Sequence, residues 1–268
     1  FAASIRRTAP GAAGEPIAAL ARNEIIHHET LLALAAVGLH SGWKRGRVSD
    51  RRAAILWTLL AAVLVTLLLV LGVWEGAKIL TPVGFALGVW LILSSLVDPI
   101  DRWRRKLTLT PALLGMALAH ASLGVFVVSI TAVETYTRER DLALAVGEAG
   151  QVGEFEYRLT GLSGVAGPNY DALRGEVVVT EGGKPVGVLY PEKRNYWVQR
   201  QVMTEAGIDM QWTRDVFVAL GEDLGAGRWS VRAQVRPLIN YVWFAAVLMA
   251  LGGIWAACDR RYRREPRA

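Results

Sequence analysis

Apolar residues are concentrated in four long runs that contain no Asp, Glu, Lys or Arg. These runs cover residues 53–74, 79–97, 107–133 and 237–258. An α-helix rises about 1.5 Å per residue, so roughly 17–25 residues are needed to cross the ~30 Å hydrocarbon core of a bilayer. Every run is long enough for one crossing. The pattern therefore predicts a polytopic α-helical membrane protein with four spans, three of them within residues 53–133.

A different pattern occupies residues 134–236, between the third and fourth runs. Apolar and polar residues alternate in FEYRL (155–159) and RWSVRAQV (228–235), as they do in half-buried β-strands. In EVVVTEGGKPVGVLY (176–190), two glycines separate strand-like stretches and favour a tight hairpin turn. VFVAL (216–220) adds a further short strand. We therefore expect an all-β domain inserted between spans three and four, with either sandwich or barrel topology.

Basic residues in the connections predict the topology. The loop WKRGRVSDRR (43–52) carries five Lys or Arg, DPIDRWRRK (98–106) carries four and the tail of residues 259–268 carries five, whereas WEGAK (74–78) carries one. Short loops rich in Lys and Arg remain on the cytoplasmic side of a membrane. This asymmetry predicts a periplasmic location for residues 134–236 and a basic cytoplasmic tail.

The overall charge follows from this topology. The chain has a formal net charge of +6, yet residues 134–236 contain 15 acidic and 12 basic residues, a net of −3. Nucleic-acid binding, which needs a clustered basic face on a folded domain, is not expected. The single cysteine, Cys258, excludes an internal disulfide and a CxxC redox pair. There is no Walker loop, GxSxG or HExxH motif, so the sequence does not indicate nucleotide use or hydrolysis.

Residues 1–42 are atypical of the rest of the chain. Charged residues interrupt their apolar stretches, and the cleanest run, 31–39, is too short to cross a membrane. An interfacial helix, or no true helix at all, is therefore expected in place of a span. No basic segment with a small-residue cleavage site follows Phe1, and we expect no signal peptide. Glu24 and His28 have the spacing of a metal pair, but two ligands without a third favour an ordinary solvated helix face.

His120 lies near the middle of the third apolar run, in GMALAHASLGVFVV (115–128). Ionisable side chains within a bilayer usually face the interior of a helix bundle or a cofactor. Ala117 and Gly124 flank His120 at i−3 and i+4 and leave room for a flat group such as haem, whose iron the imidazole could ligate. The same small residues could instead let a neighbouring helix approach, with His120 hydrogen-bonding across the contact. The residues alone leave both interpretations open.

Two stretches of the β region combine aromatic and charged residues in loop-like contexts. They are GPNYDALRG (167–175) and YPEKRNYWVQRQ (190–201). Aromatic residues of this kind anchor protein–protein interfaces, or they pack the core of their own domain. We expect Tyr196 and Trp197 in the core, and for Tyr170 both roles stay open.

Several motifs, in a fixed order, resemble the C-terminal region of the CcmF family, the haem lyase membrane proteins of bacterial cytochrome c maturation system I. The motifs are GMALAHASLGVFVVSITAVETYTRERD, GPNYDALRGEVVV, YPEKRNYWVQ, MTEAGIDMQWTRDVFVALGE and RPLINYVWFAAVLMALGGIWAACDRRYR. The resemblance covers residues 43–265 and does not extend to residues 1–42. A related assembly subunit of nitrite reductase maturation shares the pattern.

The resemblance implies a bacterial inner-membrane protein that takes haem from the periplasmic haem chaperone CcmE. Together with CcmH and CcmI, such a protein attaches the haem to the CxxCH motif of apocytochrome c. The resemblance also implies a permanent haem b with His120 as one axial ligand of the haem iron, beside Ala117 and Gly124. In the family, the second axial histidine and a tryptophan-rich haem-handling segment (WGGxWxWDPVE) belong to upstream sequence. We therefore expect haem lyase activity only from the longer protein and its complex.

On this interpretation, the β domain positions the partner subunits, the haem chaperone or the apocytochrome, and Tyr170 and Arg194 are the candidate partner-surface residues. The alternative is a cofactor-free, membrane-anchored assembly or binding module in which His120 only packs helices. A transporter subunit is not expected, because His120 is the sole histidine or charged side chain in the four apolar runs.

Overall fold

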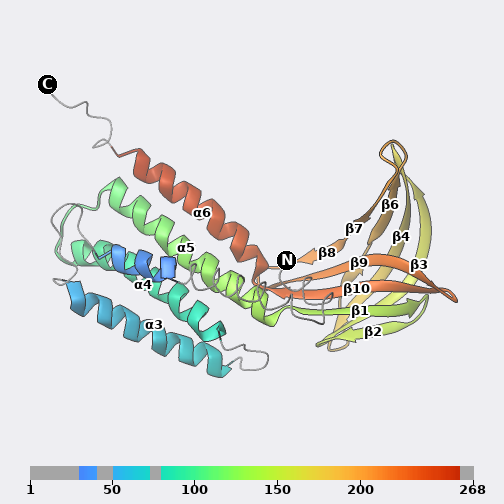
Figure 1. The fold of residues 1–268 in the computed structure, drawn as a ribbon, viewed down its shortest axis with the longest axis horizontal. Coiled ribbons are helices and arrows are strands. Elements are labelled where there is room, and N and C mark those ends of the chain that lie inside the picture. Colours follow the sequence, from blue (N-terminus) through green and yellow to red (C-terminus); the bar gives the residue numbers. More distant parts are fainter. Residues whose placement is uncertain (1–29, 41–50, 73–79, 260–268) are drawn as a thin grey trace, which may run out of the picture. The chain divides into compact units, whose positions relative to one another are not determined.

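A computed structural model of the protein describes residues 30–40, 51–72 and 80–259. The chain forms two compact units, and each is described by itself. Residues 1–131 and 244–268 form one unit, which is helical in its described part, and residues 132–243 form the other, which consists mostly of β-strands. Figure 1 shows the helices and strands of the two units.

Four long apolar helices follow the four apolar runs. They are α3 (Arg52–Gly72), α4 (Thr81–Arg104), α5 (Pro111–Tyr136) and α6 (Ile239–Ala257). All four are long and apolar enough to cross a membrane. The ten strands of the described chain all lie between α5 and α6. The predicted fold class, a helical membrane protein with an all-β domain between spans three and four, is thereby confirmed.

The helix ends differ from the ends of the apolar runs, most clearly in α4. The charged segment 98–106 is expected to form a loop, but α4 continues through Asp98 as far as Arg104. Inside this helix, Asp98 forms an ion pair with Arg51 at 2.9 Å. The charged residues from Asp98 to Arg104 therefore extend the helix beyond the apolar run.

Small residues bring α5 close to both α4 and α6. A Cβ atom on Gly124 of α5 would stand 2.6 Å from the carbonyl oxygen of Gly88 in α4. On the other side, a Cβ on Gly252 of α6 would stand 2.7 Å from the backbone nitrogen of Ala119 and 2.8 Å from the carbonyl oxygen of Gly115. These distances leave no room for side chains, so α5 packs against both helices through backbone contacts, as small residues permit in membranes.

A short helix over residues 30–38 packs against α3 and α4. Ala36 of this helix is fully buried in an apolar cluster with Trp90 and other residues of the two spans. The Trp90 indole N–H donates a hydrogen bond to Thr58 Oγ1 at 3.1 Å, which ties α4 to α3. The helix expected at the membrane interface over residues 31–39 therefore has a packing partner, because its apolar side chains bury against the two spans.

Ten strands form the β domain. They are β1 (Arg138–Ala145), β2 (Ala149–Val152), β3 (Phe155–Ala166), β4 (Tyr170–Glu181), β5 (Lys184–Leu189), β6 (Glu192–Tyr196), β7 (Gln201–Glu205), β8 (Gly207–Met210), β9 (Arg214–Gly225) and β10 (Arg228–Pro237). One sheet has the strand order β1-β10-β9-β8, and the other has the order β2-β3-β4-β6-β7 with β5 paired to β4. All pairs are antiparallel.

The two sheets enclose a single apolar core. The buried side chains come from both sheets and include Val152, Phe155, Tyr157, Leu159, Val177, Val179, Val216, Val218, Leu220 and Val231. The alternation in the sequence explains this arrangement, since Phe155, Tyr157 and Leu159 point into the core while Arg158 between them is exposed. Tyr157 keeps its hydroxyl satisfied by donating to the Gln234 carbonyl oxygen at 3.4 Å.

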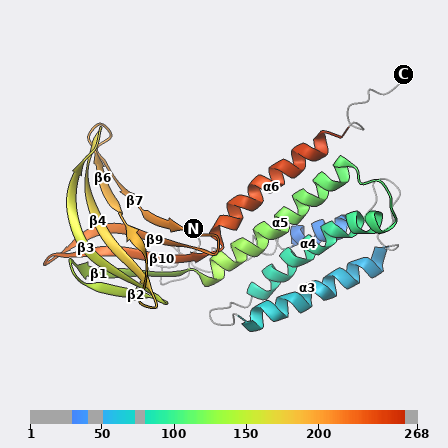
Figure 2. The same cartoon turned by 180° about the vertical axis from the view of Figure 1, so that it is seen from behind.

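The predicted hairpin is present between β4 and β5. Gly182 and Gly183 form its turn with φ values of 55° and 80°, a conformation that glycine adopts without steric cost. Strands β3 and β4 curve along their length in both views (Figures 1 and 2). Their pairing shifts register between Leu159 and Gly161, and such a bulge bends a strand and increases its twist.

Candidate functional site

His120 lies on α5 with a half-buried imidazole. Its Nδ1 is 2.9 Å from the backbone carbonyl oxygen of Met116, one turn earlier in the same helix. A carbonyl oxygen can only accept a hydrogen bond, so Nδ1 carries a proton. In the neutral ring, Nε2 then keeps its lone pair. Nε2 has no hydrogen-bond partner among the described residues. The helix therefore holds His120 in the tautomer that ligates a metal through Nε2, with the orienting hydrogen bond at Nδ1 that histidine ligands usually have.

The two small residues predicted to border a cofactor are both inside the helix packing. A Cβ on Gly124 would meet the Gly88 carbonyl oxygen and the Ile92 side chain of α4, each at 2.6 Å. Ala117 is buried as well, with 5% of its surface exposed. Helix packing, the other interpretation of this pattern, therefore explains the small residues. It does not explain His120, whose hydrogen bond stays within its own helix.

A protein-only metal centre is absent from the described residues, since no three His, Cys, Asp or Glu side chains come together there. Haem iron does not need such a cluster, because the porphyrin supplies four ligands and a single histidine can fill one axial position. The chemistry of His120 fits that position, and its ligand role stays a prediction. Glu24 and His28, considered as a metal pair, lie outside the described residues.

His40 is the second histidine that the structure describes. Its side chain is buried, with 6% of the residue exposed, and its Nε2 has no hydrogen-bond partner among the described residues. Burial lowers the pKa of His40 below its ordinary value of 6.5, Asp98 partly opposes this effect, and Arg51 adds to it. His40 is therefore neutral at pH 7.

We expect the helical unit to lose stability when the pH is lowered from 7 to 5. The folded state binds a proton at His40 more weakly than the unfolded state does. The free energy of unfolding therefore decreases as the pH drops below about 6.5. In the variant His40→Gln, which cannot titrate, this part of the pH dependence should disappear. Thermal unfolding of the chain in detergent at several pH values measures the effect. Identical pH profiles for the two proteins would contradict the prediction.

Tyr170 and Arg194 lie next to each other on the paired strands β4 and β6. Tyr170 is opposite Tyr196 in the register, and the centroids of the two rings are 5.3 Å apart. The guanidinium carbon of Arg194 lies 4.7 Å from the centroid of the Tyr170 ring, within cation–π distance. The structure thus brings together the two candidate partner-surface residues, and their binding role stays a prediction.

Arg194 also belongs to an ion-pair network around the buried Glu192, which the sequence analysis did not identify. Glu192 is 5% exposed and accepts hydrogen bonds from the Nε atoms of Arg174 at 2.6 Å and Arg194 at 2.8 Å. Burial raises the pKa of Glu192, but the hydrogen bonds and charges of the two arginines outweigh it and hold this pKa below its ordinary value. A substitution of Arg194 therefore affects folding as well as any partner contact.

The expected core position of Trp197 is wrong. Its side chain is 50% exposed, and its indole N–H donates to Asp171 Oδ2 at 2.9 Å. Trp197 begins the turn between β6 and β7. Val198 in this turn is also exposed, as are Val202 and Met203 on β7. We call these four residues the β6–β7 tip. Exposed apolar side chains beside charged ones are typical of protein interaction surfaces.

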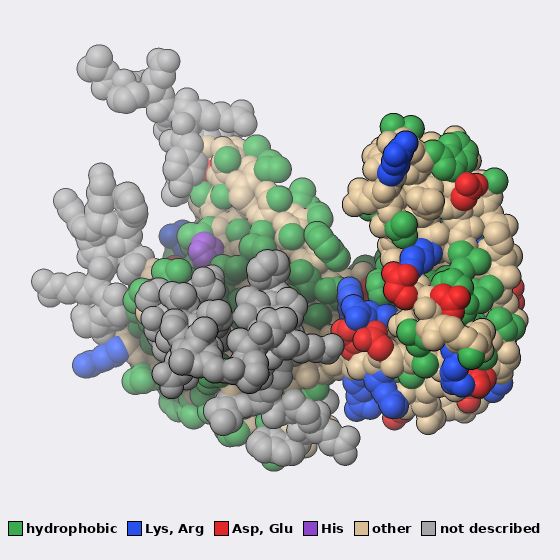
Figure 3. All heavy atoms as spheres, turned by 45° about the vertical axis from the view of Figure 1, so that its right-hand side comes forward, with side chains coloured by type: hydrophobic (Ala, Val, Ile, Leu, Met, Phe, Trp, Pro, Cys, Tyr) green, Lys and Arg blue, Asp and Glu red, His purple; other side chains and the backbone are tan. Residues whose placement is uncertain are grey.

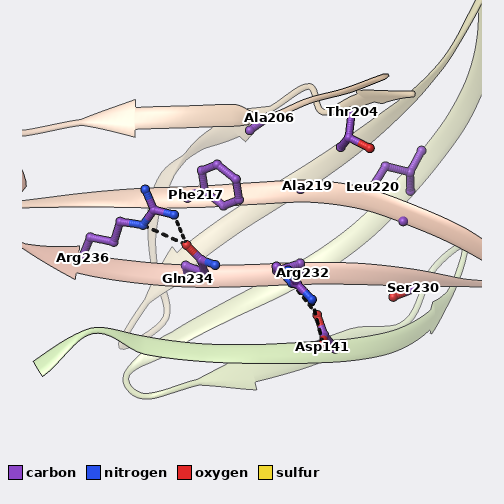
Figure 4. A pocket seen from close by; sticks show the side chains of 11 residues that line it. Asp141, Thr204, Ala206, Phe217, Ala219, Leu220, Ser230, Arg232, Gln234 and Arg236 are labelled. Carbon is purple, nitrogen blue, oxygen red and sulfur yellow. Dashed lines mark hydrogen bonds and ion pairs between the residues drawn. The ribbon is translucent and has the colours of Figure 1, made fainter. Parts of the chain in front are cut away.

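Charges elsewhere on the β domain largely pair with one another. Acidic and basic side chains are interspersed on the face of this domain that Figure 3 shows. A groove of about 380 Å³ on the four-stranded sheet contains two arginines, and both are engaged (Figure 4). Arg232 donates to Asp141 at 2.8 Å, and Arg236 donates to Gln234 at 2.8 Å and lies over the Phe217 ring. The groove is therefore a weaker candidate site than the β6–β7 tip.

Comparison with known proteins identifies the β domain and extends to the helices. The family described as the CcmF C-terminal β-sandwich matches residues 135–237, which contain all ten strands. The cytochrome c-type biogenesis protein CcmF of Pseudomonas aeruginosa is 41% identical over 185 residues, which are 67% of this chain and 28% of that protein. The CcmF protein of Pseudomonas fluorescens is 39% identical over 246 residues, which are 87% of this chain and 36% of that protein.

The fold likeness agrees with the sequence likeness. A solved structure named cytochrome c heme lyase CcmF has a TM-score of 0.70 at 18% identity, and the match covers 87% of this chain and 39% of that one. At this identity, the comparison concerns the fold alone. The chain spans about a third of the length of the curated relatives it matches. Family match, sequence identity and fold agree that the chain belongs to the CcmF family and represents its C-terminal region.

Proposed function

We propose that this chain is the C-terminal part of a haem lyase of cytochrome c maturation and that His120 is one axial ligand of a b-type haem. The observation that carries the proposal is the geometry of His120, the one histidine within the apolar spans. Its Nδ1 is bonded to Met116, and its Nε2 has no hydrogen-bond partner in the part of the chain that the structure describes. The similarity to proteins named for cytochrome c-type biogenesis supports the process. In such a protein, the haem would be transferred from a periplasmic chaperone to the CxxCH motif of apocytochrome c.

The chain contributes a fixed ligand position to this site. A bound b-type haem supplies one-electron redox chemistry, and its potential depends on the axial ligands and their hydrogen bonds. The Met116 carbonyl oxygen orients the imidazole of His120. Backbone contacts of Gly124 with α4 and of Gly115 with α6 hold the helix that carries His120. We infer that the second axial histidine comes from sequence upstream of the region that matches this chain.

We also infer an inner-membrane location with the β domain in the periplasm and residues 259–268 in the cytoplasm. The support is the excess of Lys and Arg in residues 43–52, 98–106 and the tail. In this orientation, the β domain can meet CcmE, CcmH, CcmI or apocytochrome c. We assign such a contact to Tyr170, Arg194 and the neighbouring β6–β7 tip, because these residues combine exposed apolar groups with an aromatic–cation pair.

A cofactor-free, membrane-anchored assembly module is the second candidate function. It is favoured by the close approach of α4 to Gly124, which occupies the space expected beside a cofactor. In that case, His120 would only stabilise α5. The two functions differ in one observable, the absorption of visible light by a bound haem.

The experiment that tests the proposal is the visible spectrum of a full-length CcmF protein that carries this chain as its C-terminal region. The protein is purified in detergent and measured oxidised and reduced, with His120 and with His120→Ala. We expect a b-type spectrum with two histidine ligands in the first protein and its loss in the variant, because one axial position becomes vacant.

Free imidazole provides the control. If His120 is a ligand, imidazole added to the folded His120→Ala protein should restore a two-imidazole spectrum, whereas it would have no such effect on a residue that only packs helices. A folded variant with an unchanged spectrum, or an original protein without haem absorption, would favour the cofactor-free module.

A further inference from the structure

A groove of about 740 Å³ lies between α3 and α4, and its lining residues do not include His120. Both helices belong to the same compact unit. The groove is apolar along part of its length and basic at one end. The apolar part suits a hydrocarbon chain and the basic end suits a negatively charged group, as one amphipathic ligand would provide.

The apolar part is formed by one face of each helix. Ala54, Thr58 and Ala61 have the spacing of one helix face and give α3 a surface of small side chains, while Leu93 belongs to the facing wall on α4. The Thr58 hydroxyl is already satisfied, since it donates to the Ala54 carbonyl oxygen at 2.9 Å and accepts from Trp90 at 3.1 Å. The polar atom of this wall is therefore engaged within the protein, and the surface suits a hydrocarbon chain.

At the basic end, one guanidinium group has no partner among the residues that the structure describes. Arg51, Arg104 and Arg105 line this end together with Asp101, three positive charges against one negative. Arg51 pairs with Asp98 at 2.9 Å, and Arg105 pairs with Asp101 at 2.9 Å. Arg104 forms no hydrogen bond or ion pair with any residue in the described part of the chain. Its charge remains available to an anion.

We propose that this groove binds an anionic phospholipid such as phosphatidylglycerol, with an acyl chain between α3 and α4 and the headgroup phosphate on Arg104. Arg51 immediately precedes α3 and Arg104 ends α4, so the basic end of the groove lies at the ends of both predicted spans, at the depth of lipid headgroups. Basic pockets between membrane helices bind anionic headgroups, and a guanidinium group matches phosphate geometry. Trp57, which lines the groove and is 70% exposed, suits the same interface.

Native mass spectrometry of the full chain in detergent tests the headgroup assignment. The chain is titrated with phosphatidylglycerol and, separately, with zwitterionic phosphatidylcholine, and we expect tighter binding of the anionic lipid. Arg104→Gln should weaken phosphatidylglycerol binding about fivefold, because the variant lacks one basic group that attracts the anionic headgroup. Arg102→Gln is the matched control, because Arg102 is exposed on the same helix end and does not line the groove.

Ala61→Leu tests the acyl-chain part without a change of charge. A leucine should fill the groove and weaken phosphatidylglycerol binding, and glycerol phosphate, which has no acyl chain, should bind far more weakly than the lipid. Equal binding of the two lipids to the original chain would overturn the proposal, even if a variant failed to fold. Unchanged phosphatidylglycerol binding in both folded variants would also overturn it. Glycerol phosphate bound as tightly as phosphatidylglycerol would replace the lipid with a soluble phosphate ligand.

Discussion

Replacing both Arg174 and Arg194 with methionine is expected to destabilise strands β4 and β6 by about 3–5 kcal/mol. The two guanidinium groups are hydrogen-bonded to Glu192, which is 5% exposed. Without them, a carboxylate would remain in the interior with no cationic partner, and its desolvation would no longer be offset. The expected loss is the cost of this uncompensated charge, which exceeds the net contribution of the intact network.

Single and triple variants separate this explanation from a loss of packing. Each single substitution should cost less than half as much as the double substitution, because the second arginine still pairs with Glu192. A triple variant with Glu192→Leu as well should recover most of the loss, because no charge remains buried. Hydrogen exchange of the amides in β4 and β6, measured on the full chain in detergent, reports the local opening free energies. A triple variant as unstable as the double variant would show that the arginines act through packing.

The ion-pair network around Glu192 also makes the stability of the β domain depend on pH in the acidic range. The arginines hold the pKa of Glu192 below its ordinary value of 4.5 although burial acts in the opposite direction. The folded state therefore releases this proton more readily than the unfolded state. The stabilisation is present at neutral pH and is lost as the pH falls through the lowered pKa. The exchange experiment on the original chain should consequently show weaker protection of β4 and β6 at strongly acidic pH.

The fold class could be predicted from the sequence because two simple periodicities describe most of it. Charge-free runs of sufficient length correspond to α3, α4, α5 and α6, and period-two alternation corresponds to β3 and β10. The helix ends could not be predicted in this way. Helix α4 continues through a charged segment, and the ion pair of Asp98 in that segment is with Arg51, which is 47 residues away in the sequence.

Among the residues of the candidate sites, some could also be predicted from the sequence and others could not. His120 could be identified because an imidazole in a charge-free run needs an explanation, whatever surrounds it. Gly124 could not be interpreted with equal success, because a small residue leaves space for a cofactor or a helix, and only the position of Gly88 distinguishes the two. Glu192 resembles any charged surface residue in the sequence. Its burial depends on Arg174, its register partner on β4, and on Arg194 two residues along β6.

Gly252→Leu is expected to separate α6 from α5, whereas Gly253→Leu is expected to leave the helix pair intact. A Cβ on Gly252 would stand 2.7 Å from the backbone nitrogen of Ala119, but a Cβ on Gly253 would meet nothing within 4 Å. Overpacking of this kind typically costs about 1–3 kcal/mol, and a tolerated surface change usually stays within about 0.5 kcal/mol. The neighbouring glycines thus form a matched pair, since the two variants have the same composition and nearly the same position in the span.

Unfolding of the two variants in detergent, followed by circular dichroism, measures the difference. Gly115→Leu should be as damaging as Gly252→Leu, and the two losses should not add, because both substitutions break one contact. The result also bears on the proposed haem site, since Gly115 and His120 lie on the same helix. In a full-length protein, Gly252→Leu should disturb the haem spectrum more than Gly253→Leu does. Equal stability and equal spectra for the two variants would contradict both the close α5–α6 contact and its role in holding His120 in place.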